Sequence, residues 1–157
     1  MIAKPEVLIF PARISPNYFF SLFDGENQPG QRVFFLFSVR QVEDIIADLR
    51  VYPVPFSRSH IEGISEWRGH VAPVISLEEW LGLHPEESDP PGSTRLISLR
   101  TLGNRQGRVL IRTGGEIRLM PVPVSSVPAP SAVSWVPRKE CVRGVYEWAE
   151  GYLLVIA

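Results

Sequence analysis

The chain has 157 residues, and its 16 lysines and arginines are balanced by 17 aspartates and glutamates. A domain of this length buries about 68–70% of its unfolded surface, so it needs no disulfide to hold its core. The two lysines, Lys4 and Lys139, and the scattered arginines argue against a clustered phosphate-binding face, and hence against nucleic acid as a partner. The single cysteine, Cys141, fits a reducing compartment and a structural thiol.

The N-terminal 17 residues contain one short apolar run, Val7 to Phe10, flanked by Pro5 and Pro11. This run is too short for a signal sequence or a membrane span, so we expect a cytoplasmic protein without direct membrane insertion. We interpret residues 1–17 as an extended arm and residues 18–157 as a single domain. The apolar residues of the arm would pair as an edge strand or stay partly disordered.

The next two elements are predicted from apolar runs. Residues 18–23 and 33–37 are rich in aromatic side chains and are joined by a loop with glycine and proline, which indicates a β-hairpin. The apolar residues that follow, between Val39 and Leu49, recur at helical spacing, so the pattern alone predicts a helix. Pro53 and Pro55 then require extended backbone soon afterwards.

A turn and a buried strand are predicted in the centre of the chain. Residues 71–77 are mainly apolar and rich in β-branched side chains, which is typical of a buried strand. Arg68 and Gly69 therefore lie at a turn that enters this strand. We interpret Gly69 as structural, because glycine adopts backbone conformations that are closed to other residues.

A short helix follows at once. Ser76 and Glu79 have the spacing of a capping box, in which the hydroxyl accepts from a helix-terminal N–H and the glutamate reaches back. We therefore expect a helix from Leu77 to Leu81. Gly82 supplies the left-handed position that ends such a helix.

The second half of the chain is predicted to be loops and short strands. The acidic segment 84–93 lacks periodicity and should be an exposed loop, and residues 96–99 and 108–111 should form a second hairpin. A glycine pair marks a turn at 114–115, and the proline-rich segment 121–137 should be an extended connection across the surface. Many short strands with Gly and Pro turns indicate an all-β barrel architecture.

Catalytic and metal-binding motifs are missing from the sequence. His60, His70 and His84 match no compact metal-ligand spacing, and we interpret them as surface or loop histidines. The doublets Glu78-Glu79 and Glu86-Glu87 are explained by helix N-terminal charge and solvation. The sequence therefore predicts no enzyme activity, no metal and no cofactor.

Four short segments in the middle of the chain form a sequence motif. They are Gly63-Ile64, Arg68-Gly69, Pro73 to Leu77 and Leu81 to Leu83. It resembles the G(V/I)…RG…PV(I/V)DL…LGL pattern of the CheW-like domain, the adaptor of bacterial chemosensory arrays. Further similarity lies at Phe37 to Ile45, Val54-Pro55, the segment 95–111, Arg143 to Val145 and Tyr152 to Ile156. The resemblance covers residues 18–156.

The resemblance implies an all-β fold of two small SH3-like five-stranded barrels packed together, with one or two short helices. It also implies a short turn and then a strand over Val42 to Ile46, which we prefer to the helix. In this family the groove between the barrels binds the cytoplasmic tip of a chemoreceptor. A barrel end binds the regulatory domain of a CheA-type histidine kinase. The implied function is a non-enzymatic scaffold that couples the two.

Four residues are candidates for partner binding. Arg68 matches the arginine of the R-G step, which contributes to coupling receptor and kinase, although an ion pair within the chain would also explain it. Val42 and Asp44 match the V-x-E-I segment beside the receptor groove, and for Val42 core packing is a near-equal alternative. Trp67, beside Arg68 on the turn, is a candidate exposed contact. Gly69, Ser76, Glu79 and Gly82 are structural candidates.

The chain differs from the family pattern at two residues, and it differs from multidomain members of the family in length. Ser76 replaces the usual aspartate as a helix cap, which should keep the geometry. Arg112 stands where the family has an aspartate, a charge reversal that puts any contact there in doubt. Because no further domain follows Ala157, we expect a free-standing adaptor. Arg112 and the N-terminal arm support an alternative, a diverged CheW-like scaffold in pilus motility or another non-chemotaxis pathway.

Overall fold

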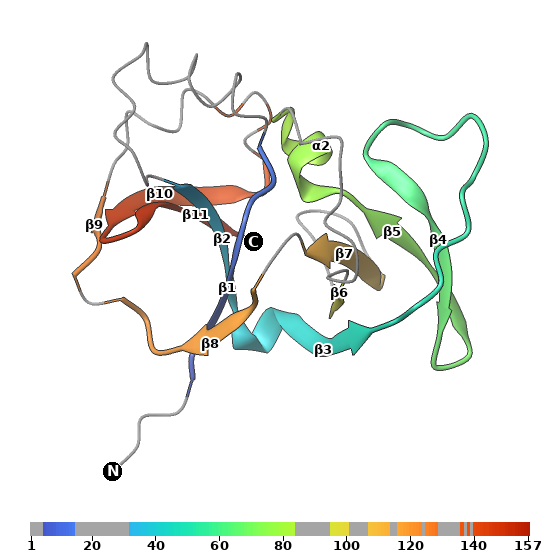
Figure 1. The fold of residues 1–157 in the computed structure, drawn as a ribbon, viewed down its shortest axis with the longest axis horizontal. Coiled ribbons are helices and arrows are strands. Elements are labelled where there is room, and N and C mark those ends of the chain that lie inside the picture. The colour runs from blue at the N-terminus through green and yellow to red at the C-terminus, as the bar shows by residue number, and fades with distance from the viewer. Residues whose placement is uncertain are drawn as a thin grey trace.

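The structure is a computed structural model that describes residues 5–14, 32–83, 95–100, 107–113, 116–123, 125–128, 136, 138 and 140–157. These residues form two twisted β-sheets that pack against each other, with a short helix between their upper ends (Figure 1). The predicted all-β class is confirmed. The first sheet, however, has six strands in the described residues rather than five.

The first sheet combines the two ends of the chain. Its strand order is β8-β1-β2-β11-β10-β9. The bounds are β8 Arg118–Met120, β1 Val7–Pro11, β2 Arg32–Ser38, β11 Gly151–Ile156, β10 Val142–Trp148 and β9 Val127–Pro128.

The second sheet comes from the middle of the chain. Its order is β3-β6-β7-β5-β4. The bounds are β3 Val42–Ala47, β6 Arg95–Leu99, β7 Val109–Thr113, β5 His70–Ile75 and β4 Ile61–Trp67, with the 3-10 turn η1 Val39–Gln41 before β3 and the helix α2 Leu77–Leu81 after β5. The antiparallel pairing of β6 with β7 confirms the second predicted hairpin.

Strand β1 corrects the interpretation of the N-terminal segment. It pairs with β2 on one side and with β8 on the other, so it is neither an edge strand nor disordered. Its side chains Leu8, Ile9 and Phe10 are fully buried. Since β2 has β1 and β11 as its two neighbours, the predicted hairpin partner of β2 is also wrong. Residues 18–23 themselves lie outside the described residues.

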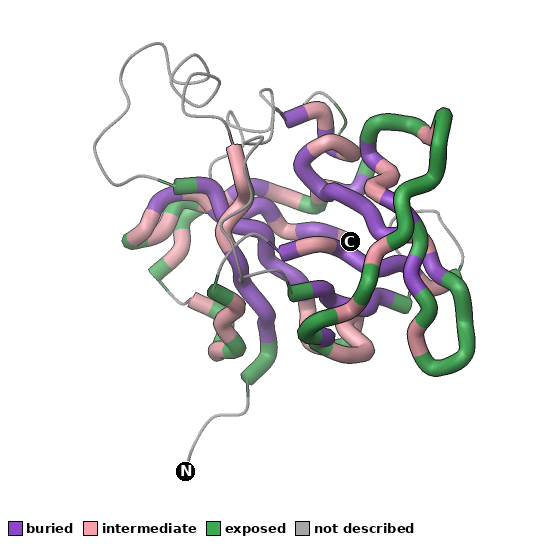
Figure 2. Tube along the Cα trace, turned by 45° about the vertical axis from the view of Figure 1, so that its right-hand side comes forward, coloured by how far each residue is buried: buried purple, intermediate pink, exposed green. Residues whose placement is uncertain are grey.

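The central strands are buried on both faces, which explains their continuous apolar sequences. In β2, Val33, Phe35 and Phe37 belong to a core cluster shared with the second sheet, whereas Phe34 and Leu36 belong to a separate cluster in the first sheet. Successive side chains of a strand point to opposite faces, so each strand contributes to two cores. Figure 2 shows this burial along the central strands.

The second sheet closes on itself beyond β3. The chain that follows β3 returns to the edge strand β4, where Tyr52 and Ile64 exchange two backbone hydrogen bonds of 2.8 and 2.9 Å. This close approach requires glycine at position 63, because a Cβ atom there would lie 2.3 Å from the carbonyl oxygen of Tyr52. The curled sheet agrees with the predicted SH3-like barrel.

The ambiguous segment after β2 is a strand, as the family resemblance implied. Only three residues of this segment are helical, in the 3-10 turn η1. The Ser38 hydroxyl and the Gln41 side chain cap this turn. Val42 then begins β3, which pairs with β6. Pairing with β6 and burial of Ile46 under the second sheet therefore override the local pattern.

Helix α2 has the predicted bounds but forms only half of the predicted capping box. The Ser76 hydroxyl accepts from the Glu79 amide at 3.4 Å. The Ser76 amide donates instead to the His60 carbonyl at 2.9 Å, so it is not available to the Glu79 side chain. Gly82 follows with φ 80° and bonds the helix carbonyls.

Two side chains that the sequence assigned to the surface are buried. Glu78, expected to be solvated, is fully buried, and His60, expected on the surface or a loop, is 7% exposed. The loop predicted at 84–93, including His84 and Glu86-Glu87, lies outside the described residues, as do the turn residues 114–115. In the described part of the chain, no helix is long and apolar enough to cross a membrane.

Candidate functional site

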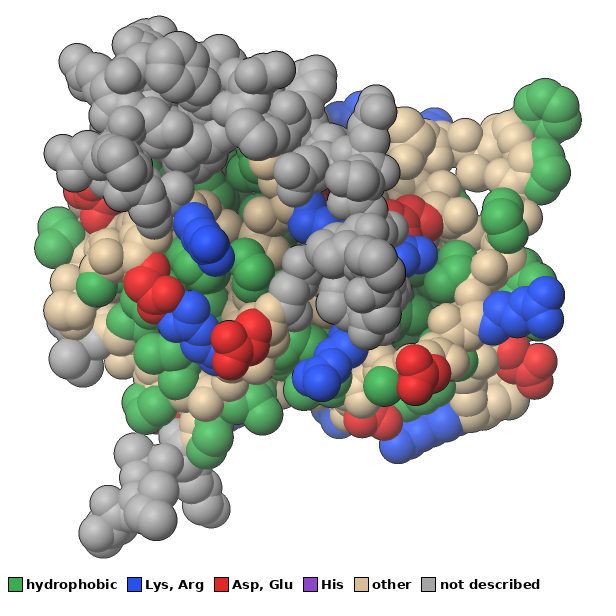
Figure 3. Space-filling model, in the orientation of Figure 1, with side chains coloured by type: hydrophobic (Ala, Val, Ile, Leu, Met, Phe, Trp, Pro, Cys, Tyr) green, Lys and Arg blue, Asp and Glu red, His purple; other side chains and the backbone are tan. Residues whose placement is uncertain are grey.

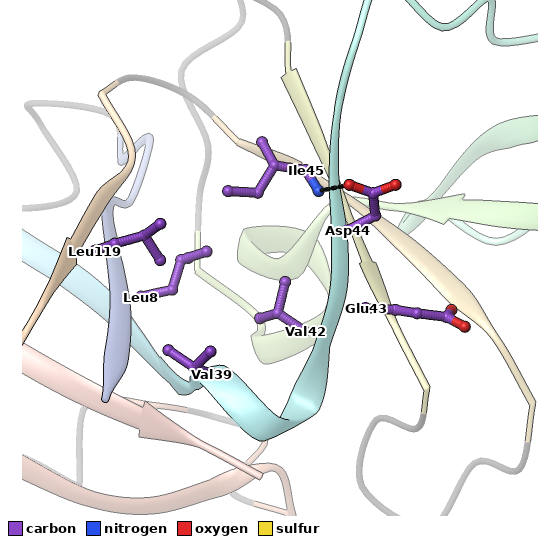
Figure 4. A pocket seen from close by; sticks show the side chains of 7 residues that line it. All are labelled: Leu8, Val39, Val42, Glu43, Asp44, Ile45 and Leu119. Carbon is purple, nitrogen blue, oxygen red and sulfur yellow. Dashed lines mark hydrogen bonds between the residues drawn. The ribbon is translucent and has the colours of Figure 1, made fainter. Parts of the chain in front are cut away.

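An apolar groove lies where the first sheet meets strand β3 (Figure 4). Its volume is about 230 Å³. Leu8 and Leu119 approach it from β1 and β8, and Val42 and Ile45 face them from β3, as the close-up shows. Leu119 and Ile45 are 51% and 37% exposed, so apolar surface is accessible at the mouth of the groove.

The two acidic residues of β3, Glu43 and Asp44, also line this groove. Their side chains leave the strand on the side opposite Val42 and Ile45 (Figure 4), and each has an arginine partner. A Val42/Asp44 register shift against β6 interrupts the strict alternation of β3. Asp44 bonds the Arg68 guanidinium at 3.1 Å, with side chains that are 38% and 62% exposed. An exposed pair of this kind stabilises a fold by only about 0.2–1 kcal/mol, so it orients Arg68 more than it holds the barrel.

The second pair is better enclosed. Glu43 accepts two bonds from Arg108, at 2.7 and 2.9 Å, and a third from the Ser98 hydroxyl at 3.3 Å. The hydrogen bonds from Arg108 hold the pKa of Glu43 below its usual range. A carboxylate bound by both arms of a guanidinium stays ionised and fixed in direction.

Trp67 joins the two ion pairs. The Arg68 guanidinium lies 4.5 Å from the centre of its ring and the Arg108 guanidinium lies 5.1 Å from it, which places two cation–π contacts on one indole. The contacts Asp44–Arg68–Trp67–Arg108–Glu43, here called the arginine–tryptophan cluster, thus link β3, the end of β4 with its turn, and the residue before β7.

The backbone of the β4–β5 turn sets the direction of Arg68. Arg68 and Gly69 both have positive φ, at 51° and 76°. For arginine this left-handed conformation is unfavourable, and it is adopted here in the two-residue turn between paired strands. A Cβ atom on Gly69 would meet nothing within 4 Å, so the glycine serves the backbone conformation and not a close contact.

A second apolar surface lies on the outer wall of the second barrel. It consists of Tyr52, Val54, Phe56, Ile64 and Val71, which we call the outer-wall patch. Its residues are 37% to 107% exposed. Figure 3 shows hydrophobic side chains at the right-hand edge of the molecule, over β4 and the segment before it. Phe56 is fully exposed and has a positive φ of 61°, an unusual conformation for a bulky residue.

Arg112 is engaged within the chain. It pairs with Glu62 on β4, and Glu62 lies 3.5 Å from Arg13, which follows β1. Arg13 in turn approaches the buried carboxylate of Glu78 at 4.0 Å. Burial raises the pKa of Glu78 to about 7, against the opposing effect of the Arg13 charge. The charge reversal at position 112 therefore belongs to an internal network between the barrels.

The structure brings three of the four predicted contact residues together. Arg68, Asp44 and Trp67 are in direct contact, whereas Val42 faces the groove on the other side of β3 and also packs on the shared core. Sequence reasoning missed Arg108 and the groove residues Leu8 and Leu119. No local signal marks these residues, because their partners lie on strands far away in the sequence.

Metal binding has no visible basis in the described residues. Within them, no group of three or more His, Cys, Asp or Glu side chains could hold a metal ion. The lone thiol, Cys141, is buried, and burial raises its pKa against an opposing hydrogen bond from Trp80. The groove and the arginine–tryptophan cluster combine exposed apolar side chains with an oriented arginine, which suits recognition of another protein.

Comparison with known proteins gives a consistent family. A sequence model of the CheW-like domain matches residues 28–157. The chain is 31% identical over 83 residues to the chemotaxis protein CheW of Thermotoga maritima, and this match spans 53% of each chain. The crystal structure of the scaffolding protein TtCheW from Thermoanaerobacter tengcongensis superimposes with a TM-score of 0.65 at 16% identity, covering 100% of this chain and 86% of that one.

Proposed function

Because the chain belongs to the CheW-like domain family, we propose that it is a chemosensory adaptor that couples chemoreceptors to a CheA-type histidine kinase. It works by holding both partners at once and not by bond chemistry, so it is not an enzyme. A change in the receptor alters kinase activity through two simultaneous interfaces, by effective concentration and population shift. The observation that carries this role is the arginine–tryptophan cluster beside an open apolar groove.

The groove suits the cytoplasmic tip of a chemoreceptor. Its volume is about 230 Å³, and most of its lining residues are aliphatic, with Glu43 and Asp44 as the acidic ones. An amphipathic helix that places an apolar residue there would bring its flanking residues next to β3. A few anchors of this kind carry most of the free energy of a protein interface.

Arg68 supplies the polar part of this recognition. Its side chain is 62% exposed, yet Asp44 and the ring of Trp67 hold its guanidinium in one direction. A guanidinium oriented in this way can donate hydrogen bonds to a partner carboxylate with little further loss of side-chain rotational freedom. Both explanations offered by the sequence, the ion pair within the chain and the interface, are therefore compatible.

The outer-wall patch is the surface that we assign to the kinase regulatory domain. It lies on the second barrel, and its exposed residues Tyr52, Phe56 and Val71 come from β5 and the segment before β4. Exposed apolar residues gathered in this way are typical of a protein interaction site. An adaptor needs two surfaces, and the groove and the outer-wall patch use different residues.

The alternative, a diverged scaffold in pilus motility or another pathway, was based on the N-terminal segment and on Arg112. Residues 7–11 form a strand of the first sheet, and Arg112 pairs with Glu62. Both features thus have structural explanations within the fold. We therefore retain the chemosensory role.

The decisive experiment is a calorimetric titration of the protein against the regulatory domain of the CheA-type kinase and against a receptor-tip fragment of the same organism. We expect dissociation constants of about micromolar strength. Arg68→Glu should weaken receptor binding by more than about 1 kcal/mol, because it reverses the charge of an exposed anchor. Phe56→Ser should weaken kinase binding and leave receptor binding unchanged.

The matched control for Arg68 is Arg95→Glu, which reverses the charge of another exposed arginine, at the start of β6 in the second sheet. This variant should bind both partners like the wild type. If Arg68→Glu lowers thermal stability as much as it lowers affinity, Arg68 is structural and has no contact role. Absence of binding to both partners would refute the adaptor role.

A further inference from the structure

A second cavity lies beside helix α2, and it shares no lining residue with the groove or the outer-wall patch. It has a volume of about 310 Å³ and is lined by Arg58, His60, Ile61, Trp80 and Arg138. We call it the α2 pocket. Three of its five lining side chains carry basic groups, none is acidic, and the other two are apolar. The arginines come from segments far apart in the sequence and converge on one space.

Backbone hydrogen bonds to α2 and its flanking loop fix this arrangement. The Arg138 amide donates to the Leu81 carbonyl at 3.1 Å, and the His60 carbonyl accepts from the Ser76 amide at 2.9 Å. The Ile61 amide closes a turn on the Arg58 carbonyl at 2.9 Å. Backbone hydrogen bonds thus connect the pocket-lining segments to both ends of the helix.

The aromatic wall of the pocket is rigid as well. The ring of His60, which is 7% exposed, packs edge-on against the Trp80 indole with 4.9 Å between the ring centres. Trp80 is half-buried and also packs on the shared core. A flat apolar surface of this kind can receive the non-polar part of a ligand.

The two arginines differ from most of those near the groove and the barrel junction. Arg13, Arg68, Arg108, Arg112 and Arg118 each form an ion pair with a carboxylate. In contrast, Arg58 and Arg138 are exposed and form no ion pair with any residue that the structure describes. Two guanidinium groups of like charge at one cavity repel each other unless an anion lies between them.

We propose that the α2 pocket binds a small organic anion whose carboxylate or phosphate group lies between Arg58 and Arg138 and whose flat apolar body lies against Trp80 and Ile61. Guanidinium groups bind both kinds of oxyanion through paired N–H donors. The apolar wall adds affinity that an inorganic anion cannot gain. Binding here does not require a receptor or a kinase, so its failure would leave the adaptor role untouched.

The test is a titration of the isotope-labelled full chain, followed by amide NMR signals, with phenyl phosphate and benzoate as anionic probes. Either probe, and at best both, should give saturable shifts at the amides of Arg58, Ile61 and Arg138, with a dissociation constant of about millimolar or tighter. The double variant Arg58→Ala/Arg138→Ala should weaken binding at least about tenfold. Both side chains are exposed, and the spectrum of the variant reports directly whether it is folded.

Two controls separate this pocket from general attraction to arginines. The double variant Arg40→Ala/Arg143→Ala removes two exposed arginines that line a different groove and should bind the probes like the wild type. Benzyl alcohol, which lacks the charge, and inorganic phosphate, which lacks the ring, should each bind more weakly than phenyl phosphate. The proposal would be overturned if benzyl alcohol or inorganic phosphate bound as tightly as phenyl phosphate, or if both double variants lost affinity equally. It would also be overturned if neither anionic probe gave a saturable shift at about 10 mM.

Discussion

At the scale of single residues, two neighbouring carboxylates on β3 have different roles. Asp44 and its partner Arg68 are 38% and 62% exposed, whereas Glu43 and Arg108 are 18% and 30% exposed. Water screens the first pair and competes for it, and the second pair makes two short bonds in a more enclosed place. Glu43 with Arg108 therefore holds the barrel wall, and Asp44 with Arg68 is available for recognition.

Double-mutant cycles should reveal this difference. We expect a coupling free energy above about 1 kcal/mol between Glu43 and Arg108, because the pair is bidentate and partly buried. For Asp44 and Arg68 the coupling should stay below about 0.5 kcal/mol, because the pair is exposed. Urea unfolding of the alanine variants measures both values, and a stronger coupling for the exposed pair would contradict the assignment.

The cap of α2 gives a second prediction at this scale. Ser76→Ala removes the hydroxyl that accepts from the Glu79 amide, so the free energy of unfolding should fall by about 1 kcal/mol. Binding to the proposed partners should be unaffected, since Ser76 is buried and away from the groove. Denaturant unfolding measures the loss. Unchanged stability would show that the cap contributes nothing.

At the scale of elements, α2 carries a buried acid between the two barrels. Glu78 is fully buried, and its Oε2 atom has no hydrogen-bond partner among the described residues. The groups that face it are Arg13, which favours the ionised form, and Glu62, which opposes it. Burial dominates, so the pKa of Glu78 is raised to about 7. The folded state therefore holds a proton that the unfolded chain releases at lower pH.

This proton gives a pH dependence of defined sign. Between the usual pKa of 4.5 and the folded value of about 7, the native state binds more protons than the unfolded state. The stability that Glu78 contributes is therefore fully present below pH 4.5, and it is lost as the pH rises through 7. The full loss is at most about 3 kcal/mol. Glu78→Gln should remove this loss, so the variant should be more stable than the wild type at pH 8 and similar at pH 5.

Urea unfolding at the two pH values measures the effect. Glu79→Gln is the matched control, because its side chain is on the same helix but only half-buried. This control should keep the wild-type dependence on pH. If Glu78→Gln loses stability between pH 5 and 8 as steeply as the wild type, another group is responsible.

At the scale of the whole molecule, one core cluster connects the two sheets. It includes Phe10, Phe35 and Phe37 from the first sheet and Ile97 and Leu99 from the second. The ring of Phe10 packs on both other phenylalanines, with 5.6 and 5.9 Å between ring centres. Because either sheet alone would expose this surface to water, the two barrels should unfold together.

We expect a single unfolding transition that has the same midpoint for tryptophan fluorescence and far-ultraviolet circular dichroism. Leu99→Ala, in the second sheet, should lower the stability of the whole molecule by about 2–5 kcal/mol, because it opens a cavity in the shared core. Ile46→Ala is the comparison, since Ile46 belongs to the separate core of the second barrel. Two separate transitions in the wild type would show that the barrels are independent.

Local patterns in the sequence determined the centre of the molecule. The turn at Arg68 and Gly69, the strand after it and the helix between Ser76 and Gly82 depend on interactions between residues a few positions apart. Backbone preferences, capping and strand periodicity act over this range. The family resemblance added the strand β3 and the two-barrel fold, which local periodicity alone would have missed.

Only the tertiary structure shows which strands are neighbours. These neighbours determine which residues come together in the candidate sites. Residues 7–11 look like an arm because their partners, β2 and β8, lie far along the chain. The position of Arg108 on Trp67 and the burial of Glu78 and His60 arise in the same way. A sequence records the chemistry of each side chain, but contacts between distant segments depend on how all the apolar faces are buried together, and that is settled only by the packing of the complete fold.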